Sequence, residues 1–284
     1  MCEFCHQHGE GKKWYLQAKN YSEDLLSDLQ RRHYIKSFLS RPEGMERSDR
    51  WLNLLDKTPL FFRQALARRI SSRQKKVHFG QVVPIEEVEE IFSLVNSIVR
   101  ISCFCRQTTL PRSQQERQRY CYAISLGPNG GKLKEIIQEV DVSYLTGPDT
   151  SGLEVLDKTV ALAALKNHER EGLCHTVWTF HTPFIGGICN CNLEHCYALR
   201  TTLRHKVPVL FRAEYIASID WDKCVGCKWC LRLCHFRGLY FDASLGKAKI
   251  NSKLCHGCGI CRSACPKRAI KLVQRNILCG GTRI

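Results

Sequence analysis

The sequence predicts an α+β protein, with a mostly helical N-terminal domain that includes a cysteine-rich α/β part, followed by a C-terminal domain organised around a repeated cysteine motif. Three observations support this prediction: apolar residues at helical spacing near the N-terminus, short apolar runs typical of strands further on, and eighteen cysteines, most of them in short clusters. With 284 residues, the chain is long enough for two domains with cores of their own. We expect a basic helical region over 1–80, a cysteine-rich region over 81–210 and a cysteine-motif domain with a tail over 211–284.

The first region is predicted to be helical and is strongly basic. Apolar residues recur at helical spacing over 25–29 and 51–55, on either side of a break at 41–44. Its positive residues form either a solvated helix face or a docking surface for an acidic partner. They include Arg31, Arg32, Arg68, Arg69, Arg73, Lys75 and Lys76.

Two helices and a strand are expected in the middle of the chain. A helix begins near Pro84, because proline suits a helix start and Glu86 and Glu87 in the first turn complement the helix dipole. A second helix covers 156–170 and ends at Gly172, which suits a left-handed cap. A strand over 173–180 follows it.

The cysteines indicate metal ligation rather than disulfides. They occur in CxxC and CxC clusters of a large chain, and the N-terminus lacks the basic start and apolar segment of an export signal. No apolar run approaches the roughly 18 residues of a membrane span. The sequence therefore predicts a cytoplasmic protein. Contact with the inner face of a membrane through a larger complex is left open.

The strongest signal is a C-x2-C-x2-C-x3-C motif that occurs twice. In this motif three cysteines surround one 4Fe-4S cluster and the fourth reaches the other cluster. The spacing thus predicts two crossed ligand sets. They are Cys224, Cys227, Cys230 and Cys265 for the first cluster, and Cys255, Cys258, Cys261 and Cys234 for the second. Zinc is the alternative, but zinc motifs normally use two CxxC pairs.

Over residues 218–273 the sequence resembles the bacterial two-cluster ferredoxins, which implies a ferredoxin-like two-cluster domain. The resemblance rests on the segment before the first cluster, Asp222-Lys223-Cys224-Val225-Gly226-Cys227, and on Cys265-Pro266-Lys267-Arg268-Ala269-Ile270. The chain departs from the family after Cys234, where His235-Phe236 stands in place of the usual proline. This departure changes the hydrogen bonding near the second cluster.

A second group of cysteines lies upstream. Cys103-Phe104-Cys105-Arg106, Gly172-Leu173-Cys174-His175 and Ile188-Cys189-Asn190-Cys191 resemble a region that precedes the ferredoxin module in a group of anaerobe iron-sulfur proteins, over residues 80–274. Two CxC pairs offer four thiolates, which suit a third 4Fe-4S cluster or a zinc ion. The preferred ligands are Cys103, Cys105, Cys189 and Cys191, with Cys121 and Cys196 as substitutes. The alternative is that these are reduced, buried cysteines.

The N-terminus carries a further candidate site. Cys2, Cys5 and His6 match the C-x-x-C-H motif of c-type haem attachment, but haem attachment of that type requires export. A metal site that uses Cys2 and Cys5 stays open beside an unliganded terminus. His6 and His8 are weaker candidates than the two cysteines.

These observations predict an electron-transfer protein. No glycine-rich nucleotide or flavin motif is present, so we expect a subunit of a larger anaerobic oxidoreductase complex rather than its catalytic subunit. The formal charge of +16 favours docking on an acidic ferredoxin, a flavoprotein or other oxidoreductase subunits. The alternatives are a catalytic reductase that uses the upstream cysteines, and a nucleic-acid-binding iron-sulfur protein. No nucleic acid is expected, because the positive residues are dispersed.

Overall fold

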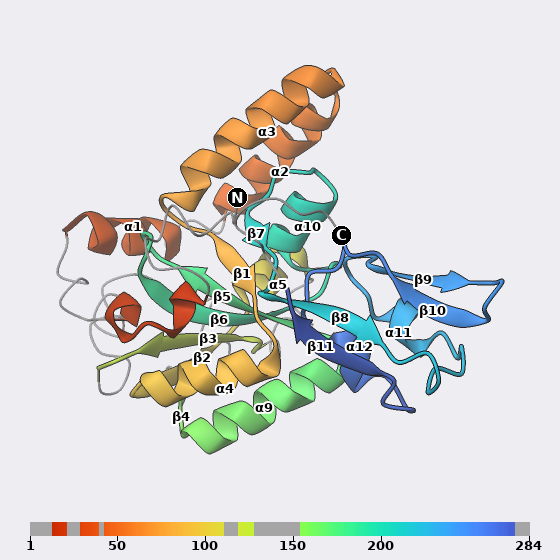
Figure 1. Ribbon diagram of the computed structural model, residues 1–284. Coiled ribbons are helices and arrows are strands. Elements are labelled where there is room, and N and C mark those ends of the chain that lie inside the picture. The colour runs from red at the N-terminus through yellow and green to blue at the C-terminus, as the bar shows by residue number, and fades with distance from the viewer. Residues whose placement is uncertain (1–12, 22–28, 40–42, 111–118, 128–153, 276–284) are drawn as a thin grey trace.

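The computed structural model describes residues 13–21, 29–39, 43–110, 119–127 and 154–275 (Figure 1). A seven-stranded sheet forms its centre, in the order β4-β2-β3-β6-β5-β1-β7. All neighbouring strands are antiparallel except β1 and β7. The strands are β1 (Gly80–Val82), β2 (Ser97–Ile101), β3 (Cys121–Ser125), β4 (Glu154–Leu156), β5 (Cys174–Thr179), β6 (Ile185–Cys191) and β7 (Leu210–Phe211).

Helices α4 (Ile85–Leu94) and α9 (Lys158–Arg170) pack side by side against one face of this sheet (Figure 1). Their apolar stripes supply Ile91 and Leu165 to a core that includes Val177 and Ile188 of the central strands. The core also takes in Trp14, from the short 3-10 helix η1 (Trp14–Leu16), and a second such helix, η2 (Ala18–Tyr21), follows it. The largest apolar core of the described residues therefore lies on this face.

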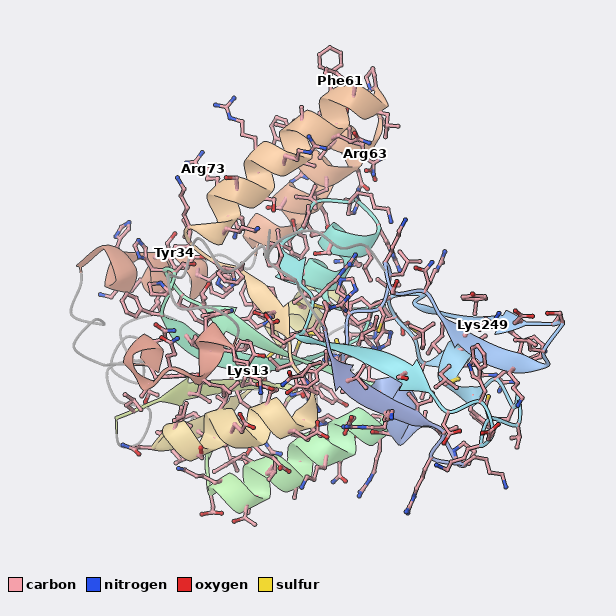
Figure 2. The ribbon with its side chains drawn as sticks, viewed as in Figure 1. Lys13, Tyr34, Phe61, Arg63, Arg73 and Lys249 are labelled. Carbon is pink, nitrogen blue, oxygen red and sulfur yellow. The ribbon has the colours of Figure 1, made fainter. Side chains whose placement is uncertain are left out.

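Helices α5 (Phe104–Thr109) and α10 (Tyr197–Leu203) lie on the other face, together with α1 (Leu29–Leu39) and the pair α2 (Glu43–Asp56) and α3 (Leu60–Lys75). The α2–α3 pair projects from the body of the molecule (Figure 1). Figure 2 shows Phe61 and Arg73 of α3 pointing away from the protein, and Phe61 is 78% exposed. Arg63 instead turns back to Asp56 of α2, with 2.7 Å between the charged atoms.

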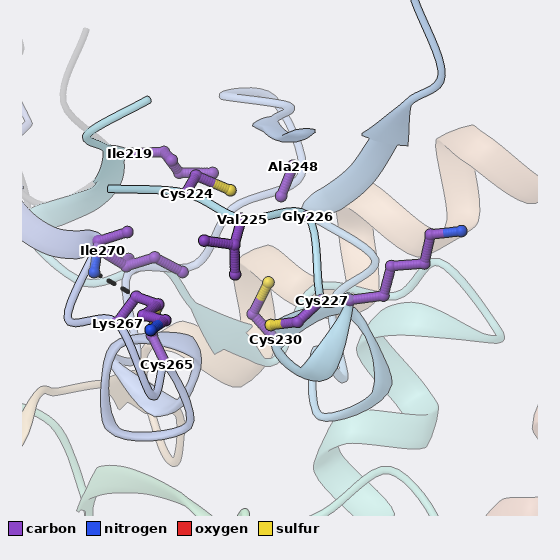
Figure 3. Close-up of a pocket in the computed structure, with 12 residues that line it drawn as sticks. Ile219, Cys224, Val225, Gly226, Cys227, Cys230, Ala248, Cys265, Lys267 and Ile270 are labelled. Atoms are coloured by element: carbon purple, nitrogen blue, oxygen red, sulfur yellow. Dashed lines mark hydrogen bonds between the residues drawn. The ribbon is translucent and has the colours of Figure 1, made fainter. Parts of the chain in front are cut away.

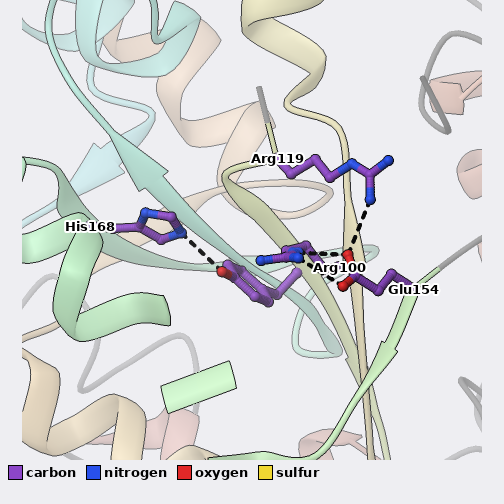
Figure 4. Close-up of polar contacts among 5 residues, drawn as sticks. Arg100, Arg119, Glu154 and His168 are labelled. Atoms are coloured by element: carbon purple, nitrogen blue, oxygen red, sulfur yellow. Dashed lines mark hydrogen bonds and ion pairs between the residues drawn. The ribbon is translucent and has the colours of Figure 1, made fainter. Parts of the chain in front are cut away.

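The edge strand β4 is held in the sheet by ion pairs of a side chain as well as by backbone hydrogen bonds. Arg100 on β2 donates two hydrogen bonds to the Glu154 carboxylate, at 2.8 and 2.7 Å, and Arg119 donates a third at 3.1 Å (Figure 4). These contacts lower the pKa of Glu154, chiefly through Arg100. On the same sheet face, Tyr122, the cross-strand partner of Arg100, pairs with His168 of α9 at 2.9 Å.

The C-terminal module is built from two short antiparallel strand pairs and two one-turn helices. Strand β8 (Tyr215–Ile219) pairs with β11 (Ile270–Gln274), and β9 (Leu239–Asp242) pairs with β10 (Lys247–Ile250). The helices α11 (Trp229–Arg232) and α12 (Ile260–Ser263) lie between them.

The module is joined to the sheet domain by an apolar core and by polar contacts. Phe236 and Ile260 pack in the same apolar cluster as Cys174, Cys191 and Leu199 of the sheet domain. The ring of His235 pairs with the carbonyl oxygen of Gly172 at 2.7 Å, and Arg262 forms an ion pair with Glu86 at 2.6 Å.

The prediction of a mixed α and β fold is confirmed, whereas a mostly helical N-terminal domain is not. Helices α1 to α3 are present, but seven strands follow or separate the helices before residue 212. The local predictions hold more closely. Pro84 is the N-cap of α4, and α9 ends before Gly172, whose φ of 84° is left-handed. No helix in the described ranges is long and apolar enough to cross a membrane.

Candidate metal centres

The C-terminal module is an internal repeat in which each cysteine of the first motif has a counterpart 31 positions later, as in Cys224 and Cys255 (255 − 224 = 31). The backbone follows the repeat. The amide of Cys224 donates to the carbonyl of Asp220 at 3.1 Å, and that of Cys255 donates to Asn251 at 2.9 Å. The two cysteine loops are therefore two copies of one conformation.

Left-handed backbone positions shape both loops. Gly226 and Gly257 have φ values of 67° and 71°, and a Cβ atom at either would lie 2.1 Å from a backbone carbonyl oxygen, of Gly246 and Tyr215 respectively. Only glycine combines this conformation with so close an approach. The glycine of each CxGC turn is therefore required for steric as well as conformational reasons.

The two loops leave two separate pockets of similar size, about 340 and 350 Å³ including space open to solvent. The first is lined by Cys224, Cys227 and Cys230 from one motif and by Cys265 from the other (Figure 3). The second has the reciprocal set, Cys234 with Cys255, Cys258 and Cys261. The fold therefore brings together the two crossed quartets that the spacing predicts.

The fourth cysteine of each motif receives a backbone hydrogen bond. The amide of Gly238 donates to the sulfur of Cys234 at 3.2 Å, and the amide of Ala269 donates to Cys265 at 3.3 Å. Such bonds stabilise negative charge on a sulfur ligand and influence the reduction potential of a cluster. In the protein without metal, burial raises the pKa of Cys230 to about 11, so a bound cation is needed to hold this thiolate.

The pockets differ in exposure. Cys227 at the first pocket is exposed, and the neighbouring Trp229 is 55% exposed. At the second pocket Cys255 and Cys261 are buried, and this pocket lies against the sheet domain through Phe236 and Ile260. One pocket is thus near the protein surface and the other faces the interior.

The upstream cysteines collect on the sheet face opposite α4 and α9. Paired residues of neighbouring strands project to the same side of a sheet, and Cys121 pairs with Cys189 while Cys174 pairs with Cys191. All four therefore project from one face. His175, one position after Cys174, projects to the other face, where it pairs with Asn190 at 2.6 Å.

Helices α5 and α10 bring three more cysteines to this face. Cys103 is the N-cap of α5 and Cys105 lies in its first turn, while Cys196 is the N-cap of α10. The fold thus gathers the preferred quartet and both substitutes. The side chains touch in a series of thiol pairs: Cys189 with Cys121, Cys121 with Cys103, Cys103 with Cys105, Cys105 with Cys196, and Cys196 with Cys191.

These contacts shift the pKa values of neighbouring thiols in opposite directions. Hydrogen bonds from Cys105 and Cys121, assisted by the charge of Arg106, hold the pKa of Cys103 well below its usual range. The hydrogen bond with Cys103 is also the main reason why the pKa of Cys105 and that of Cys121 lie well above it. Within the described residues, no group of three or more His, Cys, Asp and Glu side chains is arranged as the ligands of a single metal ion. The cysteines around the two pockets are no exception.

Three features of these sites were not found from the sequence. Cys174 lies between the upstream thiols and the second pocket, Arg106 is buried beside the thiols, and His235 connects the module to Gly172. The position of Arg106 in the CxCR segment was visible, but its burial was not. The candidate ligands Cys2 and Cys5, with His6 and His8, lie outside the described residues.

A repeated cysteine loop around two pockets defines a ferredoxin-like, two-cluster module. In agreement, residues 216–266 match the 4Fe-4S dicluster domain family. The C-terminal part of the chain is therefore an iron-sulfur electron-transfer domain with two 4Fe-4S clusters as its cofactors.

Curated relatives share this part of the chain. The indolepyruvate oxidoreductase subunit IorA of Pyrococcus abyssi is 36% identical over 63 residues, 22% of this chain and 10% of the relative. The archaeal-type glutamate synthase (NADPH) of Thermotoga sp. is 30% identical over 73 residues, 26% of this chain and 13% of the relative. The pyruvate synthase subunit PorD of Thermotoga maritima is 33% identical over 51 residues, 18% of this chain and 50% of the relative. The chain thus spans about a tenth of the length of the first relatives, and the similarity concerns the iron-sulfur region.

Proposed function

We propose that this protein is an electron-transfer subunit of a larger oxidoreductase and passes single electrons through its two 4Fe-4S clusters. The observation that carries the proposal is the pair of pockets, each lined by three cysteines of one motif and the fourth cysteine of the other. Crossed sharing of ligands places two clusters close together within one small module. Two of the relatives are named as subunits, of an indolepyruvate oxidoreductase and of a pyruvate synthase, which supports a role within a complex.

The ligands that we assign are Cys224, Cys227, Cys230 and Cys265 for the cluster near the surface, and Cys255, Cys258, Cys261 and Cys234 for the interior cluster. When bound, each cluster supplies a centre that gains and loses one electron. The chain's own groups set its environment: the amides of Gly238 and Ala269 donate to sulfur ligands, and the apolar residues around both pockets limit the access of water.

We further propose that a redox partner meets the module at the first pocket. Cys227 is exposed there, and three apolar residues near it in the sequence, Trp221, Val225 and Trp229, are exposed as well. Lys228 and Arg232 add positive charge, and the guanidinium of Arg232 lies 5.1 Å from the centre of the Trp229 ring. Apolar contact surrounded by basic side chains suits an acidic electron carrier.

The basic N-terminal region stays a second predicted docking surface. Arg68, Arg69 and Arg73 on α3 are exposed, beside the exposed apolar residues Phe61 and Phe62. The side chains of Arg31 and Arg32 lie outside the described part of the structure. A comparison of charge reversals on the two surfaces decides which of them meets a small carrier.

The test is stopped-flow electron exchange between the anaerobically reduced full-length protein and an oxidised, acidic two-cluster ferredoxin, across a salt series. We expect a fast reaction that slows as salt rises, because opposite charges steer the encounter and are screened within about 10 Å at 0.1 M salt. The double variant Lys228→Glu, Arg232→Glu should slow it on the order of tenfold at low salt. Arg68→Glu, Arg69→Glu is the matched control, since each variant changes the net charge by −4 (two substitutions of −2 each).

The outcomes separate the claims. A protein that retains its clusters, as judged by iron content, but exchanges no electrons with the carrier contradicts the proposed function. Exchange that slows more in the α3 variant than in the module variant moves the docking surface to the N-terminal region. A rate that is indifferent to salt and to both variants removes charge steering altogether.

A further inference from the structure

We propose that Cys103, Cys105, Cys121, Cys189, Cys191 and Cys196 form a buried binding site for a third iron-sulfur cluster, next to the interior cluster of the ferredoxin-like module. The inference deepens the proposed function, on which it rests, because a third cluster would extend the same electron path. It replaces the quartet expected from the two CxC pairs by a group of six thiols. Four of these, Cys121 and Cys189 among them, would be ligands, and two would lie beside them.

The arrangement of the thiols is the first argument. Residues from four separate segments bring them together: the start of α5, strand β3, strand β6 and the start of α10. Contacts link all six thiols, whereas a zinc ion holds only four thiolates around one point. A cluster spreads its ligands around a larger core, which suits a group of this size.

The position of Arg106 is the second argument. Its side chain is 3% exposed, it donates to the carbonyl of Asn190 at 3.3 Å, and its guanidinium lies 4.0 Å from the centre of the Tyr120 ring. Within the described residues no ion pair joins it to a carboxylate, and the thiols that act on its charge are Cys103, Cys191 and Cys121. A buried cation needs negative charge nearby, because an uncompensated one costs several kcal/mol. Thiolates bound to iron would supply such charge beside this guanidinium.

The third argument is the position of the site relative to the second pocket. Cys174 is fully buried, pairs with Cys191 across β5 and β6, and interacts electrostatically with Cys258 as well as with Cys196. Cys258 lines the second pocket. One buried side chain therefore separates the upstream thiols from the interior cluster of the module, and the apolar cluster around them is continuous.

The experiment is anaerobic reconstitution of the full-length chain with ferrous iron and sulfide, followed by iron, sulfide and zinc analysis and by electron paramagnetic resonance. The variants Cys121→Ser and Cys189→Ser should each bind about four fewer irons than the wild type. The matched control is Cys174→Ser, which also removes a fully buried thiol from the same sheet face but should keep the full iron content. In the reduced wild type, a paramagnetic third centre should broaden the signal of the interior cluster, and this broadening should disappear in Cys189→Ser.

The two proposals fail differently. An unchanged iron content in both ligand variants, or zinc in place of iron at the upstream site, overturns the third cluster and leaves the two-cluster function intact. Iron loss in Cys174→Ser equal to that in Cys189→Ser shows a general packing defect and also overturns the assignment. Retention of both ferredoxin signals in every variant confirms that the chain is folded, whereas their absence from the wild type contradicts the proposed function itself.

Discussion

Replacing Cys224 and Cys265 together by alanine should remove one cluster and leave the other intact, although the two residues belong to different motifs. Both line the first pocket, so the double variant should lose about four irons and retain one full 4Fe-4S signal in the reduced state. Replacing Cys224 and Cys234, which belong to the same motif but line different pockets, should damage both clusters and leave no intact 4Fe-4S signal.

The two double variants are matched, because each removes two thiols and shares the change at Cys224. Iron analysis and electron paramagnetic resonance of the anaerobically purified proteins provide the comparison. Uncrossed ligation, in which each motif holds its own cluster, predicts the opposite result: loss of one cluster in the Cys224–Cys234 variant and damage to both in the Cys224–Cys265 variant. That result would contradict the ligand assignment.

A single methyl group at Gly257 should abolish the second pocket. The Cβ of Gly257→Ala would lie 2.1 Å from the carbonyl oxygen of Tyr215, a backbone atom of β8 that is fixed by the pairing of β8 with β11. The strand or the cysteine loop must then move. Because this close approach adds to the cost of a left-handed φ of 71° in alanine, we expect a destabilisation on the order of 3–5 kcal/mol and loss of the interior cluster.

Gly246→Ala provides the control for this prediction. Gly246 also has a left-handed φ, 62°, but a Cβ there would meet no atom within 4 Å, so only the conformational cost of about 1–2 kcal/mol applies. Thermal unfolding under anaerobic conditions and iron content should therefore separate the two variants clearly. Equal losses in both would show that backbone conformation, rather than the approach to Tyr215, determines the effect.

The module was predictable from sequence because its ligand geometry is local. Three of the four thiols at each pocket come from seven consecutive residues, and the repeat of 31 residues supplies the second copy. The helix starting after Pro84 and the cap at Gly172 were also predictable, since both depend on residues within a few positions.

The upstream site depends on pairing between distant strands, which spacing alone does not fix. Cys121 and Cys189 are 68 positions apart (189 − 121 = 68) and become neighbours only through the register of β3 and β6. The two CxC pairs were recognisable from the sequence. It was not predictable that Cys121 and Cys196 belong to the same group of thiols as the cysteines of these pairs. The burial of Trp14 beneath the sheet, where its indole donates to Gln81 at 2.6 Å, is likewise a consequence of tertiary packing.

The most direct test of the account is a redox titration of the anaerobically purified Cys189→Ser protein, followed by electron paramagnetic resonance with iron and sulfide analysis. This variant isolates the two-cluster module in the full-length chain. We predict about eight irons and eight sulfides per chain, and two signals that each reach about one spin on one-electron reduction. Zinc in place of iron, about four irons, or clusters that cannot be reduced and reoxidised would contradict an electron carrier with two 4Fe-4S clusters.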